Sequence, residues 1–174
     1  MSQRVPSFFE LLNAADHSAV HLEMRDQYGV SEESDEFTRW HRGEPVDTDP
    51  DSEYWRDWTE AIRNSVARGV VVRRARIVSE PVSDYIRYEH HITSVNLAAG
   101  ELVRWLPRSQ ASDIALPGND FWLFDRKLAR FNLFDGFGGG LGPQHTEASA
   151  VVQLCASAFE SVWARGIDHE KYSV

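Results

Sequence analysis

The stretch that decides the fold reads VVVRRARIV over residues 70–78. Its apolar residues are mostly β-branched, which is typical of a strand and favours a central place in a sheet. The segment Ser79-Glu80-Pro81 follows, and it predicts a helix over residues 82–98 that ends at Gly100. Residues 102–107 then predict another strand. A strand, a helix and a strand therefore form the centre of the chain.

The residues before this centre predict three helices and one more strand. Ser7 and Glu10 match a capping box, so a short helix is expected to about residue 15. Apolar and polar residues alternate over residues 17–26, which predicts a half-buried strand. Two further helices are expected, one between residues 34 and 43 and a longer one between residues 50 and 69.

The residues after the centre predict a hairpin and a last helix. Residues 121–124 and 128–134 have the composition of two strands that turn at Asp125-Arg126-Lys127. The glycine-rich residues 136–142 lack the lysine of a P-loop and the spacing of a dinucleotide site, so they predict a flexible loop or lid. A helix to about Arg165 follows. The prediction is a single α+β domain over residues 1–174, with an antiparallel or mixed sheet of about five strands and helices packed on one face. A regular βαβ alternation along the whole chain is not evident, so a doubly wound sheet is not expected.

Composition excludes several classes of protein. The chain has 174 residues, of which 42% are apolar and 26% charged, as in ordinary globular proteins. No run of about 18 apolar residues occurs, and the first ten residues do not resemble a signal peptide, so we expect a cytoplasmic protein with no membrane contact. Cys155 is the only cysteine, which rules out an internal disulfide and predicts a buried side chain. His17 and His21 have HxxxH spacing but lack the accompanying glutamate and a third ligand. No metal or cofactor is expected.

The net charge of −9 is unevenly distributed. Residues 26–60 hold twelve acids and three arginines, whereas residues 61–108 hold eight arginines and four acids. Such a separation predicts an acidic surface that would bind a basic protein and a basic centre that could bind an anion. Direct binding to nucleic acid is not expected of so acidic a chain.

The basic centre also contains the candidate ligand site. Alternation places Arg74 and Arg76 on one face of their strand, and arginine forks beside a helix start can bind a small anionic ligand. The alternative is an ion-pair network, for example between Arg76 and Glu80, that braces the helix against the sheet. Trp40, Trp105 and Trp122 have charged neighbours and are candidates for lining a cleft or a partner surface. The candidate ligand-binding residues are Arg74, Arg76, Glu80, Asp84, Tyr85, Arg104, Trp105 and Trp122.

Five segments spread over the chain carry a resemblance to a known family. They read HLEMRDQY over residues 21–28, FTRW over 37–40, VSEPVSDY over 78–85, AGE over 99–101 and DFWLFD over 120–125. With these segments the chain resembles an uncharacterised actinobacterial domain family that is often encoded beside Xre-type helix-turn-helix regulators. The resemblance covers nearly the whole chain. It implies a regulatory neighbourhood and assigns no activity, cofactor or catalytic residue.

Three functions remain open at this point. The first is a non-enzymatic regulatory or ligand-sensing partner of a helix-turn-helix regulator, with Glu23, Asp26, Tyr28 and Trp40 as candidate partner-binding residues. The second is a small-molecule or nucleotide-processing enzyme that uses the arginine-rich strand and the acidic start of the following helix. The third is a ribonuclease-type toxin, which the acidic composition disfavours. Whether the chain is an enzyme is left open.

Overall fold

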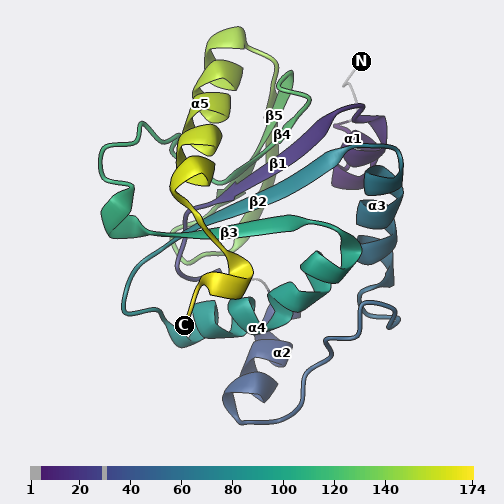
Figure 1. Cartoon of the computed structure of the whole chain (residues 1–174), viewed down its shortest axis with the longest axis vertical. Helices are drawn as coiled ribbons and strands as arrows, with labels where there is room; N and C mark the ends of the chain where they lie inside the picture. Colours follow the sequence, from purple (N-terminus) through teal and green to yellow (C-terminus); the bar gives the residue numbers. More distant parts are fainter. Residues whose placement is uncertain (1–4, 29–30) are drawn as a thin grey trace.

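The computed structural model describes residues 5–28 and 31–174. Across these residues, seven strands form one mixed sheet in the order β6-β5-β4-β1-β2-β3-β7. Figure 1 labels the strands from β1 to β5. The strands are β1 (Ser18–Glu23), β2 (Val71–Val78), β3 (Leu102–Pro107), β4 (Phe121–Phe124), β5 (Leu128–Phe134), β6 (Gly140–Thr146) and β7 (Ile167–Asp168). The α+β class and the mixed sheet are therefore confirmed, whereas the number of strands differs from the predicted five.

The helices lie on both faces of the sheet, so the prediction that they pack on one face is wrong. They are α1 (Phe8–Ala14), α2 (Ser31–His41), α3 (Arg56–Ala67), α4 (Asp84–Ala99) and α5 (Ser149–Arg165). Leu22 and Ile77 point to α5 on one face, while Ala19 and Val72 pack with α1 and α3 on the other. The central strands are apolar on both faces, which requires cover on both sides.

Strands β1, β2 and β3 are parallel neighbours, whereas β4, β5 and β6 continue the sheet in antiparallel order. The connection from β1 to β2 contains α2 and α3, and the connection from β2 to β3 contains α4. The βαβ order predicted for the centre of the chain is therefore present, and it extends back to β1, which the sequence analysis did not predict. Two helices and long loops separate β1 from β2 in the sequence, so neighbouring residues do not indicate that these two strands are parallel.

The two extra strands have weak sequence signals. β6 occupies part of the segment expected to be a flexible loop, and it contains Gly140, Gly142 and Pro143. It lies at an edge of the sheet, is largely exposed and pairs with β5 through its backbone. β7 has two residues that pair with β3. Neither strand depends on the β-branched composition by which strands are recognised.

Several local predictions are confirmed. Ser7 and Glu10 form the expected capping box at the start of α1. The hairpin between β4 and β5 turns at Asp125 and Arg126, both of which have positive φ. Gly100 ends α4 with a φ of 100°, a left-handed conformation that glycine adopts without strain.

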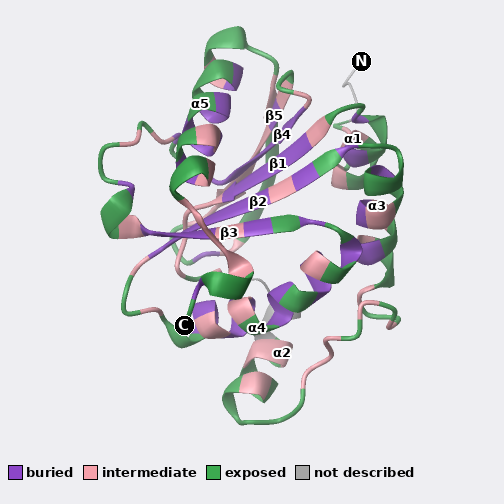
Figure 2. Cartoon of the chain, viewed as in Figure 1, coloured by how far each residue is buried: buried purple, intermediate pink, exposed green. Residues whose placement is uncertain are grey.

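Burial follows the central strands and the inward faces of α4 and α5 (Figure 2). Cys155 of α5 is fully buried, as expected, and burial raises the pKa of its thiol to about 11. Within the described part of the chain, no helix combines the length and the apolar character needed to cross a membrane.

Candidate functional site

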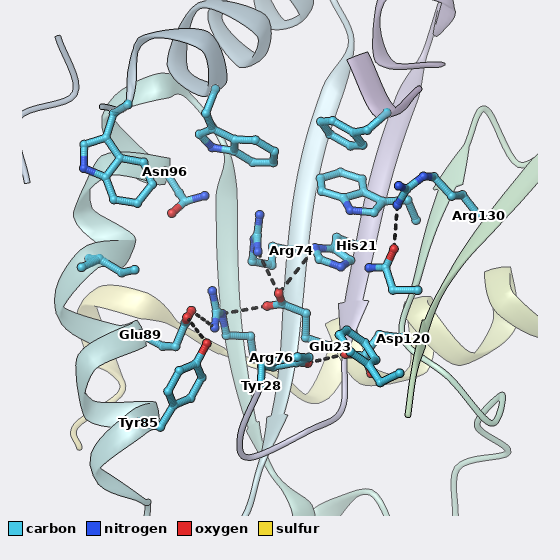
Figure 3. A pocket seen from close by; sticks show the side chains of 17 residues that line it. His21, Glu23, Tyr28, Arg74, Arg76, Tyr85, Glu89, Asn96, Asp120 and Arg130 are labelled. Atoms are coloured by element: carbon cyan, nitrogen blue, oxygen red, sulfur yellow. Dashed lines mark hydrogen bonds and ion pairs between the residues drawn. The ribbon is translucent and has the colours of Figure 1, made fainter. Parts of the chain in front are cut away.

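A pocket of about 600 Å³ lies between the sheet and the helices opposite α5 (Figure 3). Its floor is formed by two neighbouring rows of residues that cross β5, β4, β1 and β2. One row is Arg130, Trp122, His21 and Arg74, and the next is Asn132, Asp120, Glu23 and Arg76. Period-two alternation places all eight side chains on the same face of the sheet.

The walls of the pocket come from α4 and from aromatic residues. Tyr85, Glu89, Ile92 and Asn96 line one side, at spacings of four, three and four residues that fall on one face of a helix. The N-cap Ser83 fixes the start of this helix, because its hydroxyl accepts from the Ile86 amide at 3.2 Å. The aromatic residues that line the pocket are Phe8, Tyr28, Trp55, Trp58, Tyr85, Trp122 and Phe134.

The centre of the floor is an ion-pair network around Glu23. One carboxylate oxygen of Glu23 lies 3.0 Å from Arg74 Nη1, and the other lies 3.0 Å from Arg76 Nε. Arg74 Nε also donates to Glu101 at 2.8 Å, and Arg76 pairs with Glu89 of α4. Burial alone would raise the pKa of Glu23, but the Arg76 and Arg74 guanidiniums outweigh it and hold that pKa at about 2. Both arginines are thus neutralised by carboxylates, and the pair between Arg76 and Glu89 joins β2 to α4.

His21 lies beside this network with unused hydrogen-bonding capacity. Its ring stacks on Trp122 with centroids 4.3 Å apart, and the side chain is only 7% exposed. Burial lowers its pKa well below the usual range, so the imidazole is neutral and carries one donor and one acceptor nitrogen. Across the described residues, neither ring nitrogen has a hydrogen-bond partner; the nearest carboxylate oxygen, on Glu23, is 3.7 Å from Nδ1.

Arg130 is the third arginine of the pocket and is paired differently from the other two. Its Nη1 donates to Asn132 Oδ1 at 2.6 Å. In the part of the chain that the structure describes, no carboxylate lies within ion-pair distance of Arg130, and its buried Nε has no hydrogen-bond partner. Burial lowers the pKa of this guanidinium, which remains charged at neutral pH. Arg130 therefore brings an uncompensated positive charge to the pocket.

The segment after β1 closes one end of the pocket. The Tyr28 hydroxyl donates a short hydrogen bond to Asp120, whose other oxygen accepts from the Met24 amide at 2.9 Å. Burial raises the pKa of Asp120 to about 6, although the hydrogen bond from Tyr28 acts in the opposite direction. Tyr28 also packs against Phe134 and Tyr85, which joins β5 to α4 across the pocket.

Four of the eight predicted ligand-binding residues are brought together in this pocket: Arg74, Arg76, Tyr85 and Trp122. The other four lie elsewhere. Glu80 accepts from the Tyr172 hydroxyl at 2.9 Å, so the expected pair with Arg76 is wrong. Asp84 is exposed at the start of α4, and Arg104 pairs with Asp168 at 2.8 Å. Trp105 is fully buried and stacks on Tyr172.

The four candidate partner-binding residues have different surroundings. Glu23 and Tyr28 line the pocket. Asp26 accepts from the Ser79 amide at 2.7 Å, which ties the segment after β1 to the end of β2. Trp40 lies on α2 and packs against Tyr88 of α4.

Sequence reasoning missed several residues of the site. Trp55 and Trp58 are not among the residues that the sequence singles out, and His21 enters there only through its metal-ligand spacing; all three line the pocket. Alternation along β5 could have placed Arg130 and Asn132 on one face. The pairing of β5 with β4, and of β4 with β1, brings that face to the pocket, and this long-range order has no local signal.

The family model for the domain of unknown function DUF6879 matches residues 6–174. The chain belongs to the DUF6879 family. This confirms the resemblance to an uncharacterised domain family, while the actinobacterial origin and the neighbouring Xre-type regulators stay predictions. No protein with a curated description matches the sequence.

Two solved structures are similar to this DUF6879 chain in fold. One is Nuc, a phospholipase D family member from Salmonella typhimurium, which is 11% identical with a TM-score of 0.49 over 92% of this chain and 86% of that one. The other is TrmBL2, an archaeal chromatin protein, which is 14% identical with a TM-score of 0.45 over 91% of this chain and 47% of that one. At these values neither structure bears on what this chain binds.

Proposed function

We propose that this DUF6879 chain is a ligand-sensing protein that binds a small molecule in the pocket between the sheet and α4. The observation that carries the proposal is the neutral, 93% buried side chain of His21, whose two ring nitrogens have no partner among the described residues. An unsatisfied buried polar group is costly, and a bound ligand would satisfy it. A concave site with aromatic walls and a few convergent polar groups is the usual form of a small-molecule pocket.

The arrangement of α4 and α2 suggests how occupancy could be sensed. Tyr85 and Glu89 of α4 line the pocket, and Phe37 of α2 packs on Tyr85 and Tyr88 of the same helix. A ligand that shifts α4 would therefore also shift α2. The region from α2 to α3 carries exposed acids, namely Asp35, Glu44, Asp49, Asp51, Glu53, Asp57 and Glu60. We propose this acidic surface as the contact with a basic partner, of which a helix-turn-helix regulator is one example.

Ligand binding can be tested by filling the pocket. Ile92 lies on the pocket wall, so Ile92→Trp would occupy the space, whereas Leu154→Trp adds the same bulk to an exposed position of α5. The proteins are incubated with the low-molecular-mass fraction of host cells, separated by gel filtration and heated, and the released compounds are identified by mass spectrometry. A compound enriched by the wild type and Leu154→Trp but not by Ile92→Trp supports the proposal. Equal recovery from all three proteins would contradict it.

A second function is favoured by the same histidine. A neutral imidazole can take up a proton during a reaction, and the Glu23 carboxylate beside it would stabilise the imidazolium, so the pocket could belong to a small-molecule-processing enzyme. The two functions differ in the fate of the ligand. A sensor returns the compound unchanged after prolonged incubation, whereas an enzyme converts it and loses conversion in a His21→Gln variant.

The partner surface needs a separate test. Glu44, Glu53 and Glu60 are exposed acids of this region, and Glu147 and Glu170 are exposed acids far from it in sequence. Changing the first group to glutamine should weaken binding to a co-encoded basic regulator, and binding should fall at high salt. Changing the second group serves as the control. Failure to bind the regulator at low salt would remove this part of the proposal.

A further inference from the structure

The charges of the pocket restrict the ligand that it can take. Glu23, Glu89 and Asp120 line it together with Arg74, Arg76 and Arg130. Arg74 and Arg76 share Glu23, and each pairs with one further carboxylate, so three negative charges meet their two positive charges. The unmatched charge is that of Arg130, which has a side-chain amide as its partner within the described chain. A single guanidinium without a carboxylate partner can donate two parallel hydrogen bonds to one carboxylate.

A highly charged ligand would be disfavoured in the same space. A phosphate dianion or a polyphosphate would lie in one pocket with the carboxylates of Glu23 and Glu89, each of which pairs with Arg76. Repulsion between like charges is strong where water is excluded. One fixed positive charge therefore matches a monoanion.

The remaining groups of the pocket suit a flat ring. The indoles of Trp55 and Trp58 line the pocket together with Trp122 and His21 of its floor. Within the described residues, the indole Nε1 of Trp58 and both ring nitrogens of His21 lack hydrogen-bond partners. Aromatic faces favour planar ligands, and the unsatisfied nitrogens favour a ring or substituent that carries a heteroatom.

We infer that the ligand is a planar aromatic or heteroaromatic monocarboxylate, with its carboxylate on Arg130 and its ring among His21, Trp55 and Trp58. This inference rests on the proposed ligand-sensing function and adds the chemical class of the ligand. In this arrangement Arg130 binds the carboxylate, and the neutral His21 donates a hydrogen bond to the ring or accepts one from it. The carboxylates of the pocket exclude anions of higher charge.

The test compares each acid with its uncharged amide. The probes are 1-naphthoate, indole-3-carboxylate and nicotinate, each paired with its carboxamide, and AMP paired with adenosine. Binding to the full chain is measured by calorimetry and checked by the rise in melting temperature. We expect at least one carboxylate to bind at least about tenfold more tightly than its amide, because a charged hydrogen-bonded pair is lost in the amide.

Two variants test whether Arg130 causes the tighter binding of the acid relative to its amide. Arg130→Gln should reduce the ratio between acid and amide to about one, whereas Arg126→Gln, which removes an exposed arginine of the β4–β5 turn, should keep it. Equal binding of acids and amides to the wild type would overturn the inference without any variant. The inference would also be overturned if AMP bound more tightly than every carboxylate, or if no carboxylate bound. A different compound recovered by pocket-dependent enrichment would then leave the ligand-sensing function standing and reject only this chemical class.

Discussion

Replacing Glu23 by glutamine is the perturbation whose effect follows most directly from the contacts. Glu23 lies between two buried arginines, at 3.0 Å from each. Its pKa is held at about 2 instead of the ordinary 4.5. Since a tenfold change in an equilibrium is worth about 1.4 kcal/mol, this difference stabilises the folded state by about 3 kcal/mol at neutral pH.

The Glu23→Gln variant should lose that stabilisation, because glutamine has the shape of protonated glutamate and carries no charge. Arg74 keeps Glu101 and Arg76 keeps Glu89, so the loss should lie near the lower end of the range for breaking a buried pair, about 3 kcal/mol. The matched control is Glu160→Gln. Glu160 pairs with Arg73 at 2.8 Å but is 43% exposed, and its loss should cost less than about 1 kcal/mol.

The assay is urea unfolding at several pH values, with the free energy of unfolding obtained by linear extrapolation. A carboxyl group with a lowered pKa stabilises the fold above its unfolded pKa, and this contribution disappears as the pH falls toward the folded pKa. The difference in the free energy of unfolding between the wild type and Glu23→Gln should therefore reach its full value above pH 5. It should decrease between pH 4.5 and about 2. A loss below 1 kcal/mol at pH 7, or a loss that does not change with pH, would refute the reasoning.

Three other predictions follow from packing and burial. Trp105→Ala should lower the free energy of unfolding by about 3–5 kcal/mol, since Trp105 is fully buried beneath Arg76; a loss below 1 kcal/mol in urea titrations would show that the site repacks. The Asp120 carboxyl carbon should titrate near pH 6 in NMR spectra, and Tyr28→Phe should raise that midpoint because it removes a hydrogen bond to the ionised form; a midpoint near 4 would contradict the burial of this group. Gly100→Ala should cost about 1 kcal/mol or more in thermal unfolding, because its φ is 100° and a Cβ would meet Val66 at 3.3 Å, whereas Gly118→Ala should have a smaller effect.

The sequence predicts the elements that local chemistry determines. The predicted strand over residues 70–78 contains β2 because β-branched side chains favour extended backbone. Ser7 caps α1 through its hydroxyl, and Gly100 ends α4 because it lacks a Cβ and adopts a left-handed conformation without strain. Placing Arg74 and Arg76 on one face of a strand needs only the period of two. These predictions depend only on residues that are close together in the sequence, and the structure confirms them.

The parts that the sequence could not predict depend on long-range order. Nothing local shows that β4 lies beside β1, yet this pairing brings Trp122 to His21 and continues to Arg130. Arg76 pairs with Glu23 of β1 and Glu89 of α4 rather than with the nearby Glu80. The fold brings both of these carboxylates to β2, and the local sequence does not show this. The expected separation of an acidic arm from a basic centre is also modified, since buried carboxylates neutralise Arg74 and Arg76.

The most direct test of the central claim follows the six tryptophan indole signals in ¹⁵N-labelled protein while the compound recovered from host cells is added. If the ligand occupies the pocket, the indole signals of Trp58 and Trp122 should shift, while that of Trp163, on α5 across the sheet, should stay in place. Unchanged signals for Trp58 and Trp122 at saturating ligand, or an equal shift for Trp163, would contradict binding between the sheet and α4.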